Sequence, residues 1–131
     1  MTVIGASAEK YVVLPALATL LMDVLVQNDV RSGIFNFRDP NYSSENGGYH
    51  PVEIMVLNGR ISYVTDFSYV GTGYCRELAK EIDWDFGEGS FEHFGRMFEI
   101  DDAGIELWEI WQRNFVEYFN WGVYQVSFEE L

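Results

Sequence analysis

The sequence predicts an α+β fold, in which an antiparallel β-sheet of about four to five strands is packed against an N-terminal helix and a long C-terminal helix. Asn58-Gly59 lies between two runs rich in β-branched and aromatic residues, which is the strongest short-range signal of a two-residue β-hairpin. Apolar residues recur at three- and four-residue spacing near both ends of the chain, as in amphipathic helices. The elements do not alternate regularly between strand and helix, so the pattern favours an antiparallel sheet over a parallel one.

The first predicted helix begins near Leu14-Pro15 and ends at Gln27 or Asn28. Proline suits the first helical position because the N–H that it lacks would be unpaired there. One apolar stripe at helical spacing is expected to face the sheet: Leu17, Leu20, Leu21, Val24 and Leu25. Residues 1–13 are expected to be a loosely ordered lead-in, within which residues 11–14 fit either a short strand or an extended segment.

A short strand is predicted over Ile34–Phe37, and a long loop follows it over Arg38–Pro51. The loop is dense in Pro, Gly, Asn, Ser and Asp and shows no apolar periodicity. Long irregular loops are uncommon in compact domains and are often functional. The loop is therefore the first place to look for a binding site.

The central hairpin is predicted over Val52–Val70, and its tight turn predicts the register of the two strands. The expected opposite pairs are Leu57 with Arg60, Val56 with Ile61, Ile54 with Tyr63 and Val52 with Thr65. Because side chains alternate across a strand, one face is expected to be apolar and half-buried: Val52, Ile54, Val56, Ile61, Tyr63, Thr65 and Phe67. Asp66 is expected on the opposite, mixed face.

Four short elements are predicted after the hairpin. Tyr74–Ile82 favours a short helix, because Leu78 and Ile82 are four residues apart. Residues 82–86 alternate between apolar and acidic, which is typical of a strand with one wet face. Gly87–Gly95 is predicted to be a turn-rich connection, and Met97–Ile100 a short extended piece.

The C-terminal helix is predicted over Ala103–Asn120, with Asp101-Asp102 placing acid at the positive end of the helix dipole. Its expected inner face is aromatic-rich: Ile105, Trp108, Trp111 or Gln112, Phe115 and Phe119. A closing strand is predicted over Val123–Phe128. These elements are expected to form one domain over residues 1–131, because this length can bury a sizeable core without disulfides.

The N-terminus and the cysteine content predict a cytoplasmic protein. Glu9 and Lys10 interrupt the apolar N-terminal segment, and Asp23 follows before the roughly 20 apolar residues that a membrane span needs. The segment also lacks the basic start of a signal peptide. Cys75 is the one cysteine, which excludes an internal disulfide framework and suits a reducing compartment.

The charge is strongly acidic and unevenly distributed. The net charge is −13; residues 1–65 hold four basic and six acidic residues, whereas residues 66–131 hold four basic and fifteen acidic residues. Such a chain is repelled by phosphate backbones and anionic lipids, so direct binding to nucleic acid or to a membrane is not expected. Two explanations stay open: the acid keeps an aromatic-rich protein in solution, or it faces a basic partner.

Four blocks of the sequence together resemble one bacterial family, known as domain of unknown function 2787. The blocks are FNFRDPNYSSENGGYHPVEI (35–54), GRISYVTDFSYVG (59–71), EIDWDF (81–86) and LWEIWQRNF…GVYQV (107–126). The resemblance extends over about residues 14–128, and its most specific parts are FRDPNYS…GGYHPVEI and YVTDFSYVG. It implies a small cytoplasmic α+β protein, and it brings no activity, cofactor or catalytic residue.

The loop and the hairpin suggest a ligand-binding site, whose candidate residues are Arg38, Asp39, Tyr42, Tyr49, His50 and Asp66. If four of these residues converge at one edge of the sheet, they could bind an anion or act as an acid–base pair: Arg38, Asp39, His50 and Asp66. The alternative is structural: Asp39 caps a turn at Pro40, Arg38 pairs with Asp39 or with Asp66, and His50 bonds a loop carbonyl. Gly47-Gly48 lacks the residues and the following helix of a phosphate-binding loop.

No metal site, cofactor or catalytic residue is assigned from the sequence. The acidic residues near His93 resemble a carboxylate cluster, but their spacing fits no EF-hand and a solvated acidic surface explains them: Asp83, Asp85, Glu88 and Glu92. Cys75 lies beside Arg76, yet no signature of a nucleophilic cysteine accompanies it. Enzymatic activity is therefore not the favoured hypothesis.

The favoured hypothesis is a protein-binding or accessory function, with a protein partner or a second copy of the chain. Trp and Tyr are enriched at interface hot spots, and three tryptophans lie within fourteen residues of the C-terminal segment. The candidate partner-binding residues are Glu88, Glu92, Glu106, Trp108, Glu109, Trp111 and Trp121. The alternatives are a small-molecule-binding protein or minor enzyme that uses the loop 38–51, and an acidic protein that mimics nucleic acid.

Overall fold

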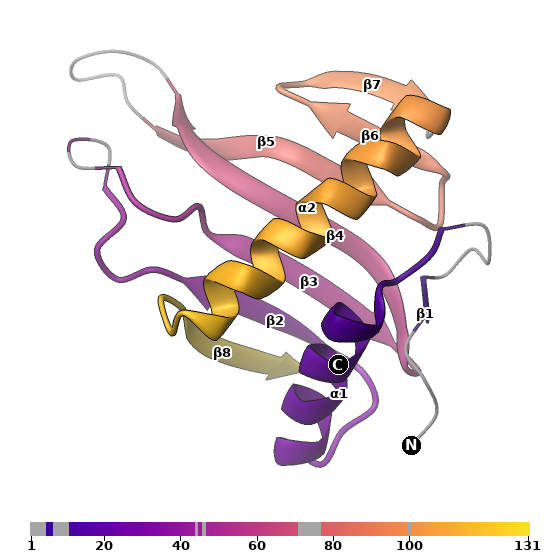
Figure 1. Cartoon of the computed structure of the whole chain (residues 1–131), viewed down its shortest axis with the longest axis vertical. Helices are drawn as coiled ribbons and strands as arrows, with labels where there is room; N and C mark the ends of the chain where they lie inside the picture. The colour runs from indigo at the N-terminus through magenta and orange to yellow at the C-terminus, as the bar shows by residue number, and fades with distance from the viewer. Residues whose placement is uncertain (1–4, 7–10, 44, 46, 71–76, 100) are drawn as a thin grey trace.

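The computed structural model describes residues 5–6, 11–43, 45, 47–70, 77–99 and 101–131. Within them lie two helices, α1 (Pro15–Gln27) and α2 (Asp102–Asn120). The strands are β1 (Gly5–Ala6), β2 (Gly33–Arg38), β3 (Val52–Leu57), β4 (Arg60–Val70), β5 (Glu77–Asp85), β6 (Ser90–His93), β7 (Arg96–Glu99) and β8 (Gln125–Glu130). Seven strands form an antiparallel sheet in the order β7-β6-β5-β4-β3-β2-β8, and β1 pairs in parallel with β4 (Figure 1). The α+β class is confirmed, whereas the predicted four to five strands were too few.

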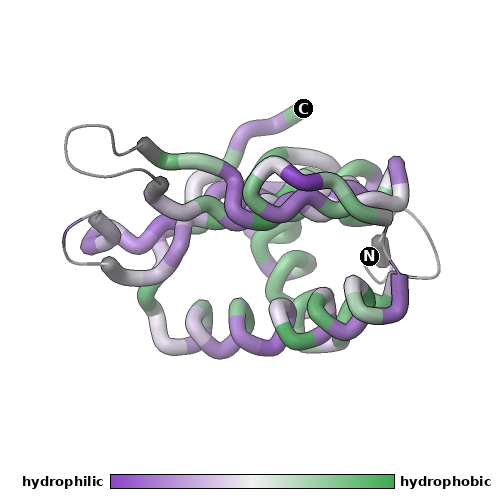
Figure 2. Tube along the Cα trace, turned by 90° about the horizontal axis from the view of Figure 1, so that it is seen from above, coloured by the Kyte–Doolittle hydropathy of each residue, from purple (hydrophilic) through white to green (hydrophobic). Residues whose placement is uncertain are grey.

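The molecule has two layers, with the sheet in one and both helices in the other (Figure 2). Helix α2 runs obliquely across the middle strands, and α1 lies beside its C-terminal half (Figure 1). The core between the layers is built from the apolar stripe of α1, alternate residues of β2 to β5 and the aromatic residues of α2, including Leu21, Phe35, Ile54, Trp84 and Trp108. None of the described helices is long and apolar enough to cross a membrane.

The turn of the central hairpin is confirmed, but the predicted register is wrong beyond the first two pairs. Asn58 and Gly59 have φ of 50° and 79°, as a turn with two left-handed residues requires. Ile54 lies opposite Val64, and Val52 opposite Asp66, because a β-bulge shifts the pairing between Met55 and Val56. Ser62 is the extra residue of the bulge. It therefore turns Val64 and Asp66 toward the helices and Tyr63 toward the open face of the sheet.

The predicted helix over Tyr74–Ile82 is also wrong. Residues 77–85 form strand β5, which pairs with β4 from Val70↔Glu77 to Tyr63↔Asp85. Leu78, Ala79 and Lys80 favour helix locally, but pairing with the long strand β4 and burial of Trp84 outweigh that preference. Residues 74–76 of the predicted helix lie outside the described residues. The predicted connection 87–95 in fact contains β6. The predicted extended piece is confirmed over residues 97–99, which belong to β7.

Helix α2 begins as predicted, with the Asp101 side chain accepting a hydrogen bond from the Gly104 N–H at 2.9 Å. Two of its side chains hold the extended segment that leads into α1. Trp108 Nε1 and Gln112 Nε2 donate to the Val12 carbonyl, at 2.9 and 3.1 Å, and Gln112 Oε1 accepts from the Leu14 N–H at 2.7 Å. These contacts fix the position of α2 over the sheet, and with it the side chains that α2 contributes to the site described next.

Candidate functional site

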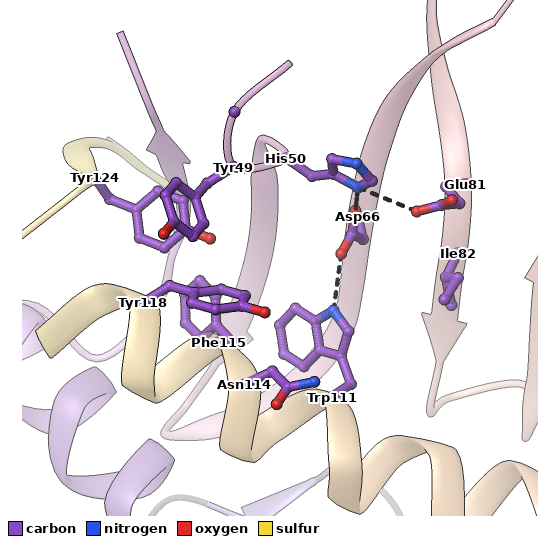
Figure 3. A pocket seen from close by; sticks show the side chains of 11 residues that line it. Tyr49, His50, Asp66, Glu81, Ile82, Trp111, Asn114, Phe115, Tyr118 and Tyr124 are labelled. Carbon is purple, nitrogen blue, oxygen red and sulfur yellow. Dashed lines mark hydrogen bonds and ion pairs between the residues drawn. The ribbon is translucent and has the colours of Figure 1, made fainter. Parts of the chain in front are cut away.

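A cavity of about 400 Å³ opens between α2 and the sheet, where the loop 39–51 enters β3 (Figure 3). The loop, β4, β5, α2 and the segment before β8 all contribute to its walls. Its lining consists of Gly48, Tyr49, His50, Asp66, Glu81, Ile82, Trp111, Asn114, Phe115, Tyr118 and Tyr124. One end of the cavity is therefore polar and charged, whereas most of the wall is aromatic.

Two β-bulges determine the directions of the two carboxylates of this site. The bulge at Ser62 turns Asp66 toward the helical layer. A second register shift leaves Glu81 unpaired, because Asp66 lies opposite Ile82 and Phe67 lies opposite Lys80. Bulges often redirect side chains next to functional sites. Without them, strict alternation would not place both carboxylates on the His50 side of the sheet.

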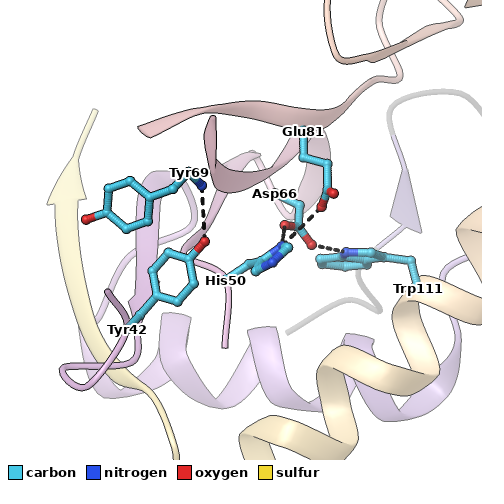
Figure 4. A network of polar contacts seen from close by, with 6 residues as sticks. All are labelled: Tyr42, His50, Asp66, Tyr69, Glu81 and Trp111. Carbon is cyan, nitrogen blue, oxygen red and sulfur yellow. Dashed lines mark hydrogen bonds and ion pairs between the residues drawn. The ribbon is translucent and has the colours of Figure 1, made fainter. Parts of the chain in front are cut away.

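Asp66 and Glu81 converge on one nitrogen of His50 (Figure 4). His50 Nδ1 lies 2.8 Å from Asp66 Oδ1 and 3.1 Å from Glu81 Oε2. The other oxygen of Asp66, Oδ2, accepts a hydrogen bond from Trp111 Nε1 at 2.9 Å. The Asp66 carboxylate is thus fixed from two sides, by the histidine and by a buried indole of α2.

The two carboxylates raise the pKa of His50 above its ordinary value of 6.5. The hydrogen bond to Asp66 is the largest cause, and the nearby charge of Glu81 adds to it against the opposing effect of burial. On the aromatic side, burial first and the negative charge of Asp66 second raise the pKa of Tyr124, so its hydroxyl stays protonated at neutral pH. The site accordingly combines an imidazole, two carboxylates and phenolic hydroxyl groups.

The loop is held in place by Asp39 and Tyr42, which do not line the cavity. Asp39 accepts hydrogen bonds from the backbone N–H of Asn41 at 2.9 Å and of Tyr49 at 3.0 Å. The Tyr42 ring stacks on Tyr69 and also contacts the His50 ring, with centroids 5.2 and 5.6 Å apart. Gly48 has φ of +124°, and a Cβ there would lie 2.9 Å from Asp39 Oδ2, so the turn requires glycine.

Aromatic rings form the opposite wall. Tyr49 lies against Tyr118, with centroids 4.8 Å apart, and against Tyr124 at 6.4 Å. Trp111 and Phe115 stack with an interplanar angle of 9° and a centroid separation of 5.0 Å. Aromatic rings in offset or edge-to-face arrangements of this kind attract one another and so stabilise the wall. The wall therefore offers several preformed ring faces to a bound molecule.

The structure brings together only part of the sequence-predicted ligand site. Tyr49, His50 and Asp66 line the cavity, and Asp39 and Tyr42 position the loop around them. Arg38 is exposed at the end of β2 and does not line the cavity. Sequence reasoning missed the residues that other elements supply: Glu81, Ile82, Asn114, Phe115, Tyr118 and Tyr124. The alternation of apolar and acidic residues over 82–86 predicted a strand, and the aromatic residues near the C-terminus predicted a packed helix. Neither pattern shows that side chains of these elements lie near His50.

The sequence-predicted partner-binding residues do not share one surface. Trp108 and Trp111 are buried in the core, whereas the Trp121 side chain is 59% exposed. Glu106 and Glu109 lie on α2. Glu88 and Glu92 instead line a cavity of the sheet, whose other lining residues are Asp83, Asp85, Ser90 and Met97. Asp83 and Asp85 alternate with the buried Trp84, which places this cavity on the face opposite α2. Cys75 lies outside the described residues.

We expect His50 to titrate above pH 6.5 in the folded, metal-free protein and to titrate lower in an Asp66→Asn variant. NMR titration of the histidine ring protons measures this, and a His93→Gln variant assigns the two signals. Because the folded state holds the proton more tightly than the unfolded chain, the stabilisation is fully present below pH 6.5 and is lost as the pH rises through the folded-state value. Equal titration of His50 in wild type and Asp66→Asn would contradict the described contact.

Comparison with known proteins places the chain in a family. The model of a family described as "Protein of unknown function (DUF2787)" matches residues 13–129. Among solved structures, the hypothetical protein VC0508 from the Vibrio cholerae pathogenicity island VSP-II aligns with a TM-score of 0.80 and 33% identity, over 89% of this chain and 93% of that chain.

A second Vibrio cholerae structure is similar, and its description extends the comparison. The conserved hypothetical protein VC1805, from pathogenicity island VPI-2, aligns with a TM-score of 0.79 and 32% identity over 89% of this chain and 94% of that chain. VC1805 is described as sharing structural homology with the human P32 protein. No match is found among curated proteins. From the family match and these two structures, we conclude that the chain belongs to the DUF2787 family.

Proposed function

We propose that the protein binds a small, neutral, ring-bearing molecule in the cavity between α2 and the sheet. The observation that supports this most directly is the lining itself, in which stacked aromatic rings stand opposite a polar group of His50, Asp66 and Glu81 (Figure 3). Small-molecule sites typically combine a mainly apolar wall with a few converging polar groups. The ring of the ligand would stack on the tyrosines, and its polar end would face His50.

The size of the cavity suits such a ligand. Its volume of about 400 Å³ lies within the range of known small-molecule pockets, which is roughly 300–1,000 Å³. Tyr49, Tyr118 and Tyr124 are partly buried, so their rings are held by neighbours and still reach the cavity. Aromatic side chains lose little conformational freedom on binding, because they have only two rotatable bonds.

The charge of the cavity disfavours an anionic ligand. None of the eleven described residues that line it is Lys or Arg, and two of them are carboxylates. The chain as a whole carries a net charge of −13, which adds a repulsive field around any approaching anion. The anion site expected from the sequence would have required Arg38 to reach His50, and Arg38 does not line the cavity.

A fragment screen tests the proposed function. Saturation-transfer NMR with neutral ring compounds and matched carboxylated analogues should give binders among the neutral compounds and few among the anionic ones. Tyr118→Ala removes one ring of the aromatic wall and should weaken binding of the best compound about fivefold, as loss of one stacked ring costs on the order of 1 kcal/mol. Phe98→Ala, at a surface ring of β7 that is 41% exposed, is the matched control and should leave binding unchanged. Equal loss in both variants, or binding of the anionic set alone, would refute the proposal.

Binding of a protein partner is a second candidate function, and exposed apolar side chains favour it. Phe94, Met97 and Phe98 are 51%, 70% and 41% exposed on the β6–β7 hairpin, at one edge of the sheet. The burial of Trp108 and Trp111 removes two of the rings on which the sequence-based partner hypothesis depended. A cytoplasmic location and mimicry of nucleic acid also remain proposals, supported by the cysteine content and by the acidic charge, respectively.

A further inference from the structure

We propose that His50, Asp66 and Glu81 form a binding site for one first-row divalent transition-metal ion. The ligand atoms of these three residues lie within 4.8 Å of one another at the polar end of the cavity. They come from three different elements: the loop before β3, strand β4 and the bulge of β5. The inference concerns the metal ion alone, so it does not require the proposed organic ligand.

The ligand atoms lie slightly closer together than those of a coordination shell. Zn²⁺ lies about 2.0–2.2 Å from histidine nitrogen and carboxylate oxygen and is usually tetrahedral, so two of its ligand atoms are about 3.4 Å apart. His50 Nδ1 lies 2.8 Å from the Asp66 oxygen and 3.1 Å from the Glu81 oxygen. Small movements of the side chains would open this group around an ion.

Hydrogen bonding alone accounts less well for the arrangement. Two carboxylate oxygens face the same ring nitrogen, Nδ1 of His50, and this nitrogen carries at most one hydrogen (Figure 4). One N–H cannot point straight at both acceptors, and hydrogen bonds weaken steeply when they bend. A cation between the three groups would accept electron pairs from all of them at once.

The surroundings of Asp66 resemble the support that metal ligands receive in proteins. Trp111 Nε1 donates to Asp66 Oδ2 at 2.9 Å and leaves Oδ1 directed at the site. Such outer hydrogen bonds orient metal ligands and often change metal affinity 10–100-fold when they are lost. Asp66 and Glu81 are also partly shielded, with side chains 14% and 24% exposed. An ion there would be less screened by water than one on the open surface.

The ligand set indicates the class of ion. Imidazole suits Zn²⁺, Fe²⁺ and their neighbours, and carboxylates are accepted by the same ions, whereas Ca²⁺ and Mg²⁺ prefer all-oxygen sites. Three protein ligands leave at least one coordination position toward the cavity, where a water molecule or a donor atom of a bound ring compound fits. The charges of Asp66 and Glu81 would balance the two positive charges of the ion.

Titration calorimetry with ZnCl₂ and MnCl₂, on protein stripped with a chelator and in the absence of any organic compound, tests the site. We expect one ion per chain and a loss of affinity of about tenfold or more in Asp66→Asn and in Glu81→Gln. The control is the double variant Asp85→Asn, Glu88→Gln, which removes two carboxylates from the acidic cavity on the opposite face and should bind as wild type does.

A second measurement follows the histidine ring signals of the wild-type protein, assigned with the His93→Gln variant. Mn²⁺ is paramagnetic, so at substoichiometric amounts it should broaden the ring signals of His50 before those of His93. Absence of metal binding, equal affinity in wild type and both site variants, or broadening of His93 first would overturn the inference. Because no organic compound is present, failure of the fragment screen leaves the metal result standing, and failure of metal binding leaves the fragment result standing.

Discussion

Replacing Trp108 with alanine is expected to lower the free energy of unfolding by roughly 3–5 kcal/mol, the usual cost of removing a large aromatic side chain from a core. Trp108 is 1% exposed and packs between layers, with ring centroids 5.6 Å from Trp84 and 4.8 Å from Phe86. Its indole N–H also donates to the Val12 carbonyl at 2.9 Å. Chemical denaturation followed by far-UV circular dichroism measures the loss.

Leu107→Ala is the matched control for this variant. Leu107 precedes Trp108 on α2, and its side chain is 37% exposed. Its removal should therefore lower the free energy of unfolding much less than removal of the Trp108 side chain does. If the two variants lose equal stability, the described orientation of α2 over the sheet is wrong. Trp108→Ala should also weaken the binding of any ligand in the cavity, because it frees α2 to shift. Trp111, which lines the cavity, stacks directly on Trp108 with ring centroids 5.7 Å apart.

Local sequence signals predicted the elements whose structure depends on local chemistry. A two-residue hairpin turn requires left-handed backbone at two successive residues, which Asn58 and Gly59 tolerate, and the turn lies there. Asp101 could accept from the first turn of a helix, and it caps α2. In both cases the interacting groups are within a few residues of one another, so a short window of sequence contains the whole explanation.

Elements that depend on distant partners were not predictable in the same way. The segment 77–85 contains good helix formers, and only the pairing with β4 makes it a strand. The bulges at Ser62 and Glu81 arise from how β3, β4 and β5 match one another, which no single strand encodes. A one-residue shift exchanges the faces of a strand, so the orientation of Asp66 could not be inferred before the pairing was known.

The candidate site also combines residues that a short stretch of sequence predicts with residues that only the folded structure brings together. His50 and Asp66 were predicted together because both belong to the loop-and-hairpin region of the chain. Glu81 and Trp111 were missed as their partners, because the first was assigned to a helix and the second to an interaction surface. The two carboxylates and the indole meet only after the sheet and α2 have assembled. Convergence of this kind is a property of packing.

Replacing Gln112 with leucine is expected to lower the free energy of unfolding by roughly 1–3 kcal/mol, although leucine is more apolar and the position is fully buried. Gln112 Oε1 accepts from the Leu14 N–H at 2.7 Å, and this N–H belongs to the residue that precedes the first turn of α1. Leucine would leave that partly buried donor without its partner, at a cost larger than the gain from additional apolar contact.

A substitution at the neighbouring residue, Arg113, is the control for Gln112→Leu. It distinguishes loss of the buried hydrogen bond from a general effect of altering α2. Arg113 forms an ion pair with Glu109 at 2.7 Å, but its side chain is 64% exposed, so Arg113→Met should change stability by less than about 0.5 kcal/mol. Thermal and chemical denaturation of both variants measure the difference. Since Gln112 and Trp108 both hold the Val12–Leu14 segment, a Trp108→Ala, Gln112→Leu double variant should lose less than the sum of the single losses. Full additivity would show that the two side chains fix α2 independently, and that the segment before α1 does not couple them.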